Sequence, residues 1–70
     1  MSPIGTVEIL SGYHEIKYSP SFRAPNSGET RAPECHTVYE IVQKEDCVWF
    51  CVGENRWLAN DSSLMTIKLY

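Results

Sequence analysis

The sequence has no long hydrophobic run and no even number of cysteines. Its 70 residues include three cysteines, an odd number, so at least one thiol is free or pairs outside the chain. No apolar run approaches the about 20 residues of a membrane helix, and the opening Met-Ser-Pro-Ile-Gly has no charged leader followed by an apolar core. We therefore expect a domain excised from a larger protein and given a start methionine.

A cluster of positive charge is also missing. The six Lys and Arg residues are scattered and the net charge is −3, which gives no electrostatic reason to expect nucleic acid as a partner. The hydrophobic content of 43% is typical of a folded chain. A single domain spanning 1–70 buries only about 60% of its unfolded surface. A binding module is therefore favoured over an enzyme with a deep cavity.

Metal-binding and catalytic patterns are weak. There is no Cys-x-x-Cys pair, so we expect no zinc site, no other metal and no cofactor. Cys47 and Cys51 would lie roughly 13 Å apart along one strand, too far to bridge. The neighbours Cys35 and His36 would point to opposite faces of a strand, which opposes a nucleophile-base dyad. We expect no catalytic residues and no enzymatic activity.

The stretch 47–58 predicts a hairpin around which the chain is organised. Val48, Phe50 and Val52 alternate with Cys47, Trp49 and Cys51, so the first three are expected in the core and Trp49 on the surface. Gly53-Glu54-Asn55 suits a tight turn, and Arg56-Trp57-Leu58 begins the return strand, with Trp57 nearer to the core.

The remaining segments also predict strands, and the fold class expected is all-β, with five or six short strands that curl into a small barrel or a sandwich. Residues 36–43 fit a helix or a strand by periodicity, and their β-branched and aromatic composition favours a strand. The other expected elements are strands at 4–10, 14–18 and 65–69, a long loop at 19–28, a break at 32–34, a polar turn at 44–46, and a turn or single helical turn at 60–63.

Four segments follow one another in a recognisable order: His14-Glu15-Ile16-Lys17 with Ser19-Pro20-Ser21-Phe22, Thr37-Val38-Tyr39-Glu40-Ile41, Trp49-Phe50-Cys51-Val52-Gly53 and Asn55-Arg56-Trp57-Leu58. This order resembles the bacterial SH3-like domains of cell-wall hydrolases and phage endolysins. The resemblance spans most of the chain, although the second element departs from the family's usual Leu-Asn-Ile-Arg and Pro33-Glu34-Cys35 replaces its usual Lys-Gly turn.

The resemblance implies a small SH3-like barrel of five to six short antiparallel strands. It also implies a non-catalytic module that binds peptidoglycan or wall peptides and keeps an attached hydrolase near its substrate. The parent protein would then be extracellular or located in the cell wall. Aromatic faces offer stacking area with little entropic cost, and acidic side chains could pair with free amines of a wall peptide. The candidate ligand-binding residues are Tyr18, Phe22, Glu45, Asp46, Trp49 and Trp57.

Each candidate ligand-binding residue could instead have a purely structural role. A tryptophan in a small barrel more often packs in the core than binds a ligand. Tyr18 and Phe22 could cover the open end of the barrel, and Glu45 and Asp46 could form a solvated turn. The same aromatic groove could instead bind a protein segment, or the domain could serve as a structural spacer.

Overall fold

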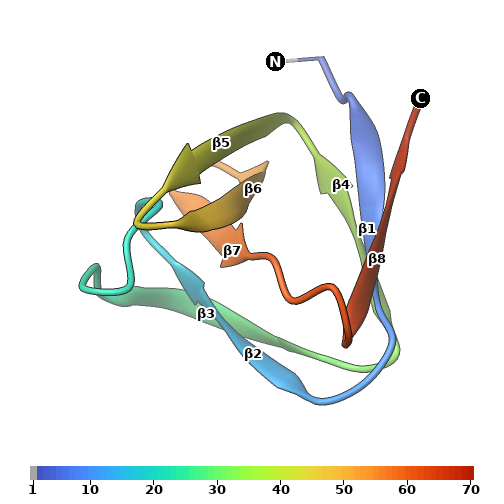
Figure 1. Cartoon of the computed structure of the whole chain (residues 1–70), viewed down its shortest axis with the longest axis horizontal. Coiled ribbons are helices and arrows are strands. Elements are labelled where there is room, and N and C mark those ends of the chain that lie inside the picture. Colours follow the sequence, from blue (N-terminus) through green and yellow to red (C-terminus); the bar gives the residue numbers. More distant parts are fainter. Residues whose placement is uncertain (1) are drawn as a thin grey trace.

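The structure, a computed structural model, describes residues 2–70 and consists of short strands joined by turns (Figure 1). All strand pairs are antiparallel, and no helix occurs within residues 2–70. The predicted all-β class is confirmed, but the described chain has eight strands rather than five to six: β1 (Gly5–Ile9), β2 (Tyr13–Lys17), β3 (Asn26–Arg31), β4 (Glu34–Val38), β5 (Glu40–Lys44), β6 (Cys47–Gly53), β7 (Arg56–Ala59) and β8 (Met65–Leu69).

The strands form two sheets, in the orders β4-β1-β8 and β3-β2-β7-β6-β5. The chain passes from one sheet to the other at Tyr39, whose amide donates to the carbonyl of Cys51 at 2.8 Å. The segment 36–43 is thus extended, as its composition indicates, but this crossing divides it between β4 and β5. The sheets do not close into a barrel among the described residues.

β3 is a strand that the sequence did not predict. The expected loop through Gly28 was wrong from Asn26 onward, because these residues pair with β2. β3 is an edge strand with only Thr30 buried, so its backbone can pair without an apolar pattern. A Cβ added at Gly28 would lie 3.3 Å from Nη1 of Arg56, and the missing side chain therefore leaves room for this guanidinium.

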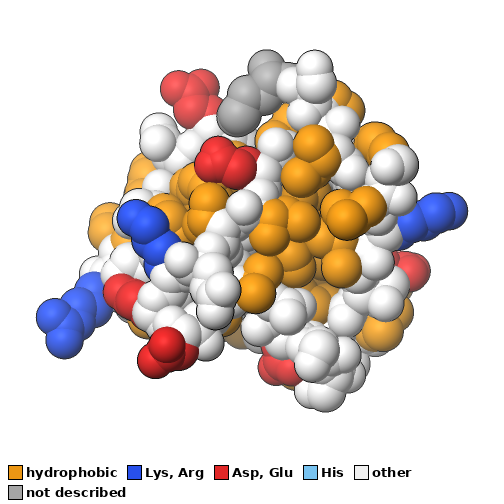
Figure 2. All heavy atoms as spheres, turned by 45° about the horizontal axis from the view of Figure 1, so that its top comes forward, with side chains coloured by type: hydrophobic (Ala, Val, Ile, Leu, Met, Phe, Trp, Pro, Cys, Tyr) orange, Lys and Arg blue, Asp and Glu red, His pale blue; other side chains and the backbone are white. Residues whose placement is uncertain are grey.

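The core lies between the sheets. Residues of both sheets contribute to it, and Phe50 lies in it as expected, with Val48 and Val52 packed against its edge. Ile67 and Leu69 of the edge strand β8 are 38% and 59% exposed. Figure 2 shows a cluster of hydrophobic side chains near the centre of the face it displays. The core residues are Val7, Ile9, Ile16, Val38, Phe50, Leu58 and Met65.

The second face of β6 is also covered. Trp49 is fully buried and Cys51 is 4% exposed, so the expectation that Trp49 lies on the surface was wrong. Trp57 is half-buried and lies outside the core cluster. Alternation indicates which side chains share a face of a strand, but it does not tell whether another segment covers that face.

Candidate functional site

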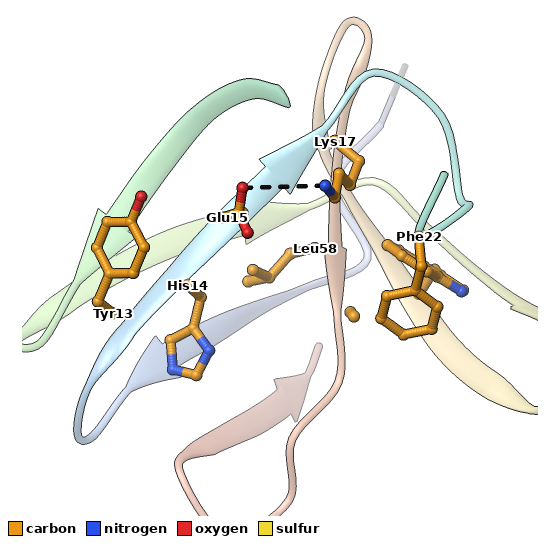
Figure 3. A pocket seen from close by; sticks show the side chains of 8 residues that line it. Tyr13, His14, Glu15, Lys17, Phe22 and Leu58 are labelled. Atoms are coloured by element: carbon orange, nitrogen blue, oxygen red, sulfur yellow. Dashed lines mark ion pairs between the residues drawn. The ribbon is translucent and has the colours of Figure 1, made fainter. Parts of the chain in front are cut away.

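A groove opens where β2 separates from β7. These strands pair only at Ile16↔Leu58 and Lys17↔Trp57, so the first half of β2 is free of β7. The resulting cavity has a volume of about 240 Å³, and Figure 3 shows Phe22 at one end of it and Tyr13 with His14 at the other. The lining residues are Tyr13, His14, Glu15, Lys17, Phe22, Trp49, Leu58 and Ala59.

Two aromatic rings form the apolar end of the groove. The ring centroids of Phe22 and Trp49 lie 4.7 Å apart at an interplanar angle of 57°, a favourable tilted arrangement. Trp49 Nε1 donates to the carbonyl oxygen of Lys44 at 3.1 Å, so this buried ring leaves no polar atom unsatisfied. Phe22 is 54% exposed and is therefore the ring that a ligand can reach.

The turn between β5 and β6 fixes the loop that positions Phe22. Ser21 Oγ donates to Glu45 Oε1 at 2.7 Å, and the amide of Phe22 donates to Glu45 Oε2 at 3.0 Å. These two hydrogen bonds, first the amide of Phe22 and then the hydroxyl of Ser21, lower the pKa of Glu45. Glu45 and Asp46 both have positive φ, 56° and 58°, as a type I′ hairpin turn requires.

The rim of the groove contains both signs of charge. Lys17 Nζ lies 3.9 Å from Glu15 Oε2 and donates to Asn26 Oδ1 at 2.7 Å. The side-chain amide of Asn26 in turn donates to Glu15. Figure 3 shows the Glu15 and Lys17 side chains approaching each other. A ligand thus meets one carboxylate and one ammonium, held in place by an amide of β3.

Hydrogen bonds also fix the opposite end of the groove. Tyr13 donates its hydroxyl to Glu29 Oε2 at 2.7 Å, and this bond is the main cause that raises the pKa of Tyr13. The guanidinium carbon of Arg31 lies 5.3 Å from the centroid of the Tyr13 ring. His14 Nε2 lies 3.1 Å from the carbonyl oxygen of Ser11. Both ring side chains are therefore positioned by contacts within the chain.

The structure brings together only some of the predicted site residues. Phe22 and Trp49 line the groove, and Glu45 acts on it by holding the Phe22 loop. Tyr18, Asp46 and Trp57 do not line it. Asp46 belongs to the exposed turn, where the positive φ that it adopts is a turn role.

Sequence reasoning missed the β2 half of the groove. Tyr13, Glu15 and Lys17 alternate along β2, and this alternation was the available signal because it places the three side chains on one face. It could not show that β2 would separate from β7 after two residue pairs, since that depends on the register of strands distant in sequence.

A second polar cluster joins β3 to β4. Thr30 is 1% exposed and donates its hydroxyl to Glu34 Oε1, while His36 Nε2 lies 2.8 Å from the same hydroxyl oxygen. Thr30 has a single hydroxyl proton, so His36 must donate from Nε2. Burial lowers the pKa of His36, and the hydrogen bond from Thr30 lowers that of Glu34.

No group of three or more His, Cys, Asp or Glu side chains in residues 2–70 is arranged to hold a metal ion. No helix in this part of the chain is long and apolar enough to cross a membrane. Comparison with known proteins gave no match to a family model, to a curated protein or to a solved structure.

Proposed function

We propose that this chain is a non-catalytic binding module whose groove takes a short peptide, and that the peptide belongs to the bacterial cell wall. The observation that supports binding is the groove itself, with an exposed aromatic ring at one end and a Glu15–Lys17 pair at its rim. The cell wall as the source of the peptide rests on the sequence resemblance. Binding there would keep an attached hydrolase near its substrate.

The size and chemistry of the groove suit a small part of a peptide. A volume of about 240 Å³ lies below the range of about 300–1,000 Å³ typical of sites that enclose a whole small molecule. It is therefore suited to one or two side chains. Phe22 supplies apolar contact, while Glu15 and Lys17 can bind an amine and a carboxylate, groups that wall peptides contain.

The lining residues favour binding over catalysis. They include no cysteine, serine or threonine. Of the other groups that can act as nucleophiles, Lys17 and Glu15 pair with each other and Tyr13 donates its hydroxyl to Glu29. His14 is the only histidine among them, and its Nε2 is bonded to the carbonyl of Ser11. In the second cluster, the Thr30 hydroxyl is buried and already hydrogen-bonded to Glu34.

The test is co-sedimentation of the domain with purified peptidoglycan sacculi from several bacteria, with Phe22→Ala as the groove variant. Phe22 is 54% exposed, so its removal should leave the fold intact and weaken binding about tenfold, the loss expected for one aromatic contact. Trp49→Ala is unsuitable for this test because Trp49 is fully buried.

Tyr18→Ala is the matched control. Tyr18 is 49% exposed and does not line the groove, so this variant should bind like the wild type. Equal loss of binding in both variants would argue against the groove, and no binding to any sacculus would refute the cell wall as the target. Saturable binding of a protein segment, sensitive to Phe22→Ala, would instead favour a protein-interaction module.

A further inference from the structure

β5 is an exposed edge strand whose two charged side chains form no salt bridge among residues 2–70. It ends the order β3-β2-β7-β6-β5, and Figure 1 shows it at the margin of the molecule. Four of its five residues are exposed. Glu40 and Lys44 take part in neither of the ion pairs found among residues 2–70. Both a row of backbone groups and two opposite charges are thus available to another molecule.

Two residues of β5 direct their backbone N–H and C=O groups away from β6, where another strand can bind them. Lys44 and Cys47 flank the two-residue turn, and flanking residues of such a turn form a hydrogen-bonded pair. The peptide groups of Lys44, Val42 and Glu40 therefore point toward β6, and those of Ile41 and Gln43 point outward. A new antiparallel strand would bond to Ile41 and Gln43.

The order of the side chains is self-complementary. Glu40 and Lys44 each lie two residues from Val42. In an antiparallel pair of two β5 strands centred on Val42, Glu40 of each copy is opposite Lys44 of the other, and Ile41 is opposite Gln43. Opposite charges in directly facing positions stabilise strand pairs, and like charges destabilise them. A two-fold axis through Val42 gives two favourable pairs at once.

The charged side chains of β3, the other edge strand of this sheet, are not available to a partner in the same way. β3 also contains an acidic and a basic residue, Glu29 and Arg31, but they already form an ion pair 3.9 Å long within the chain. Glu29 also accepts the hydroxyl of Tyr13, and Arg31 lies over the Tyr13 ring. The charges of β3 are thus paired within the chain, whereas Glu40 and Lys44 of β5 form no salt bridge among residues 2–70.

We propose that two copies of this chain associate by antiparallel pairing of their β5 strands, centred on Val42, which joins their two five-stranded sheets into one. Two five-residue strands bury less area than the about 1,200–2,000 Å² of a standard stable interface. The dimer is therefore weak and concentration-dependent, and added salt weakens it. It does not depend on the function proposed for the groove.

Charge reversal provides the test, with sedimentation velocity from about 10 μM to about 1 mM, the range of weak association. Glu40→Lys places two lysines opposite each other twice, and Lys44→Glu does the same with two glutamates. Each single variant should raise the dissociation constant about tenfold or more. Both residues are exposed, and circular dichroism verifies that each variant is folded.

The decisive experiment is sedimentation of a mixture of the two single variants. The Glu40→Lys chain opposite the Lys44→Glu chain restores both opposite-charge pairs, so the mixture should form a heterodimer of wild-type affinity. The double variant should restore the homodimer. A wild type that stays monomeric up to 1 mM, single variants that dimerise like the wild type, or a mixture that stays monomeric would each overturn the proposal.

Discussion

At the scale of single residues, Phe22 and Trp49 illustrate how two rings in contact can have different roles. Their centroids are 4.7 Å apart, yet one ring is 54% exposed and the other is fully buried. Burial of a large aromatic side chain contributes to stability, whereas an exposed aromatic face is available to a ligand. Trp49 thus supports the groove, and Phe22 is its accessible surface.

Truncation of these two residues should therefore differ in its effect on stability. Trp49→Ala should lower the free energy of unfolding by about 3–5 kcal/mol, because it leaves a cavity and removes the hydrogen bond from the indole to the carbonyl of Lys44. Phe22→Ala should lower it by about 1 kcal/mol or less. Urea denaturation measures both, with Trp49→Phe as a milder variant if the alanine variant is unfolded. Equal losses for the two alanine variants would contradict the burial of Trp49.

At the scale of elements, the β5–β6 turn holds the loop between β2 and β3 in place. Glu45 accepts two hydrogen bonds from Ser21 and Phe22, and the indole of Trp49 bonds to the carbonyl of Lys44. Arg23 and Lys44 add favourable charge near the Glu45 carboxylate. The shape of the groove thus depends on a turn that does not line it.

Acid should release the loop between β2 and β3 from Glu45, because protonation weakens the hydrogen bonds that this carboxylate accepts. The folded-state pKa of Glu45 is lowered, so its carboxylate contributes stability above its unfolded pKa, and this contribution is lost as the pH falls through the folded value. Glu45→Gln, which cannot accept both hydrogen bonds equally well, should remove this part of the acid transition. The measurement is the indole N–H resonance of Trp49 by NMR between about pH 6 and pH 3, which brackets the ordinary Glu pKa.

Asp46→Asn is the control for that titration. Asp46 lies in the same turn with φ 58°, a conformation that asparagine tolerates. Glu34 and His36 also titrate in the folded chain with lowered pKa values, and both variants retain these groups. A Trp49 resonance that follows the same pH profile in Glu45→Gln as in Asp46→Asn would refute the role given to Glu45.

At the scale of the whole molecule, the reactivity of the three free cysteines depends on how tightly the sheets pack around each thiol. Cys35 is exposed, Cys47 is half-buried and Cys51 is buried. Cys51 Sγ donates to the carbonyl of Gly53 at 3.2 Å, and its exposed fraction is 4%. A thiol reagent can therefore reach Cys51 only when the surrounding strands open.

Alkylation should thus proceed in the order Cys35, then Cys47, then Cys51. The alkylation rate at Cys51 should fall as the folded domain becomes more stable. It should increase in low concentrations of urea, since the reaction requires the surrounding strands to open. Mass spectrometry after timed labelling measures the three sites separately. Cys35→Ser provides a control, because it removes the fastest site without altering the core. Reaction of Cys51 as fast as Cys35 would contradict the packing of β6 described above.

Sequence determined the local features of this protein. Two-residue periodicity located most of the strands, and the residues that tolerate positive φ, such as Asn55 with φ 57°, marked the hairpin turns. The contrast between Phe50 in the core and Trp49 on the opposite face of β6 was also present in the alternation. These features depend on near neighbours in the chain, so a single sequence can reveal them.

Only the tertiary structure decided which faces are covered and where strands separate. β3 has no apolar alternation and forms because β2 offers it backbone partners. Trp49 is buried because a loop more than 20 residues away folds over it. The groove exists because β2 and β7 share only two residue pairs. Each of these depends on contacts between segments distant in sequence, which local periodicity does not encode.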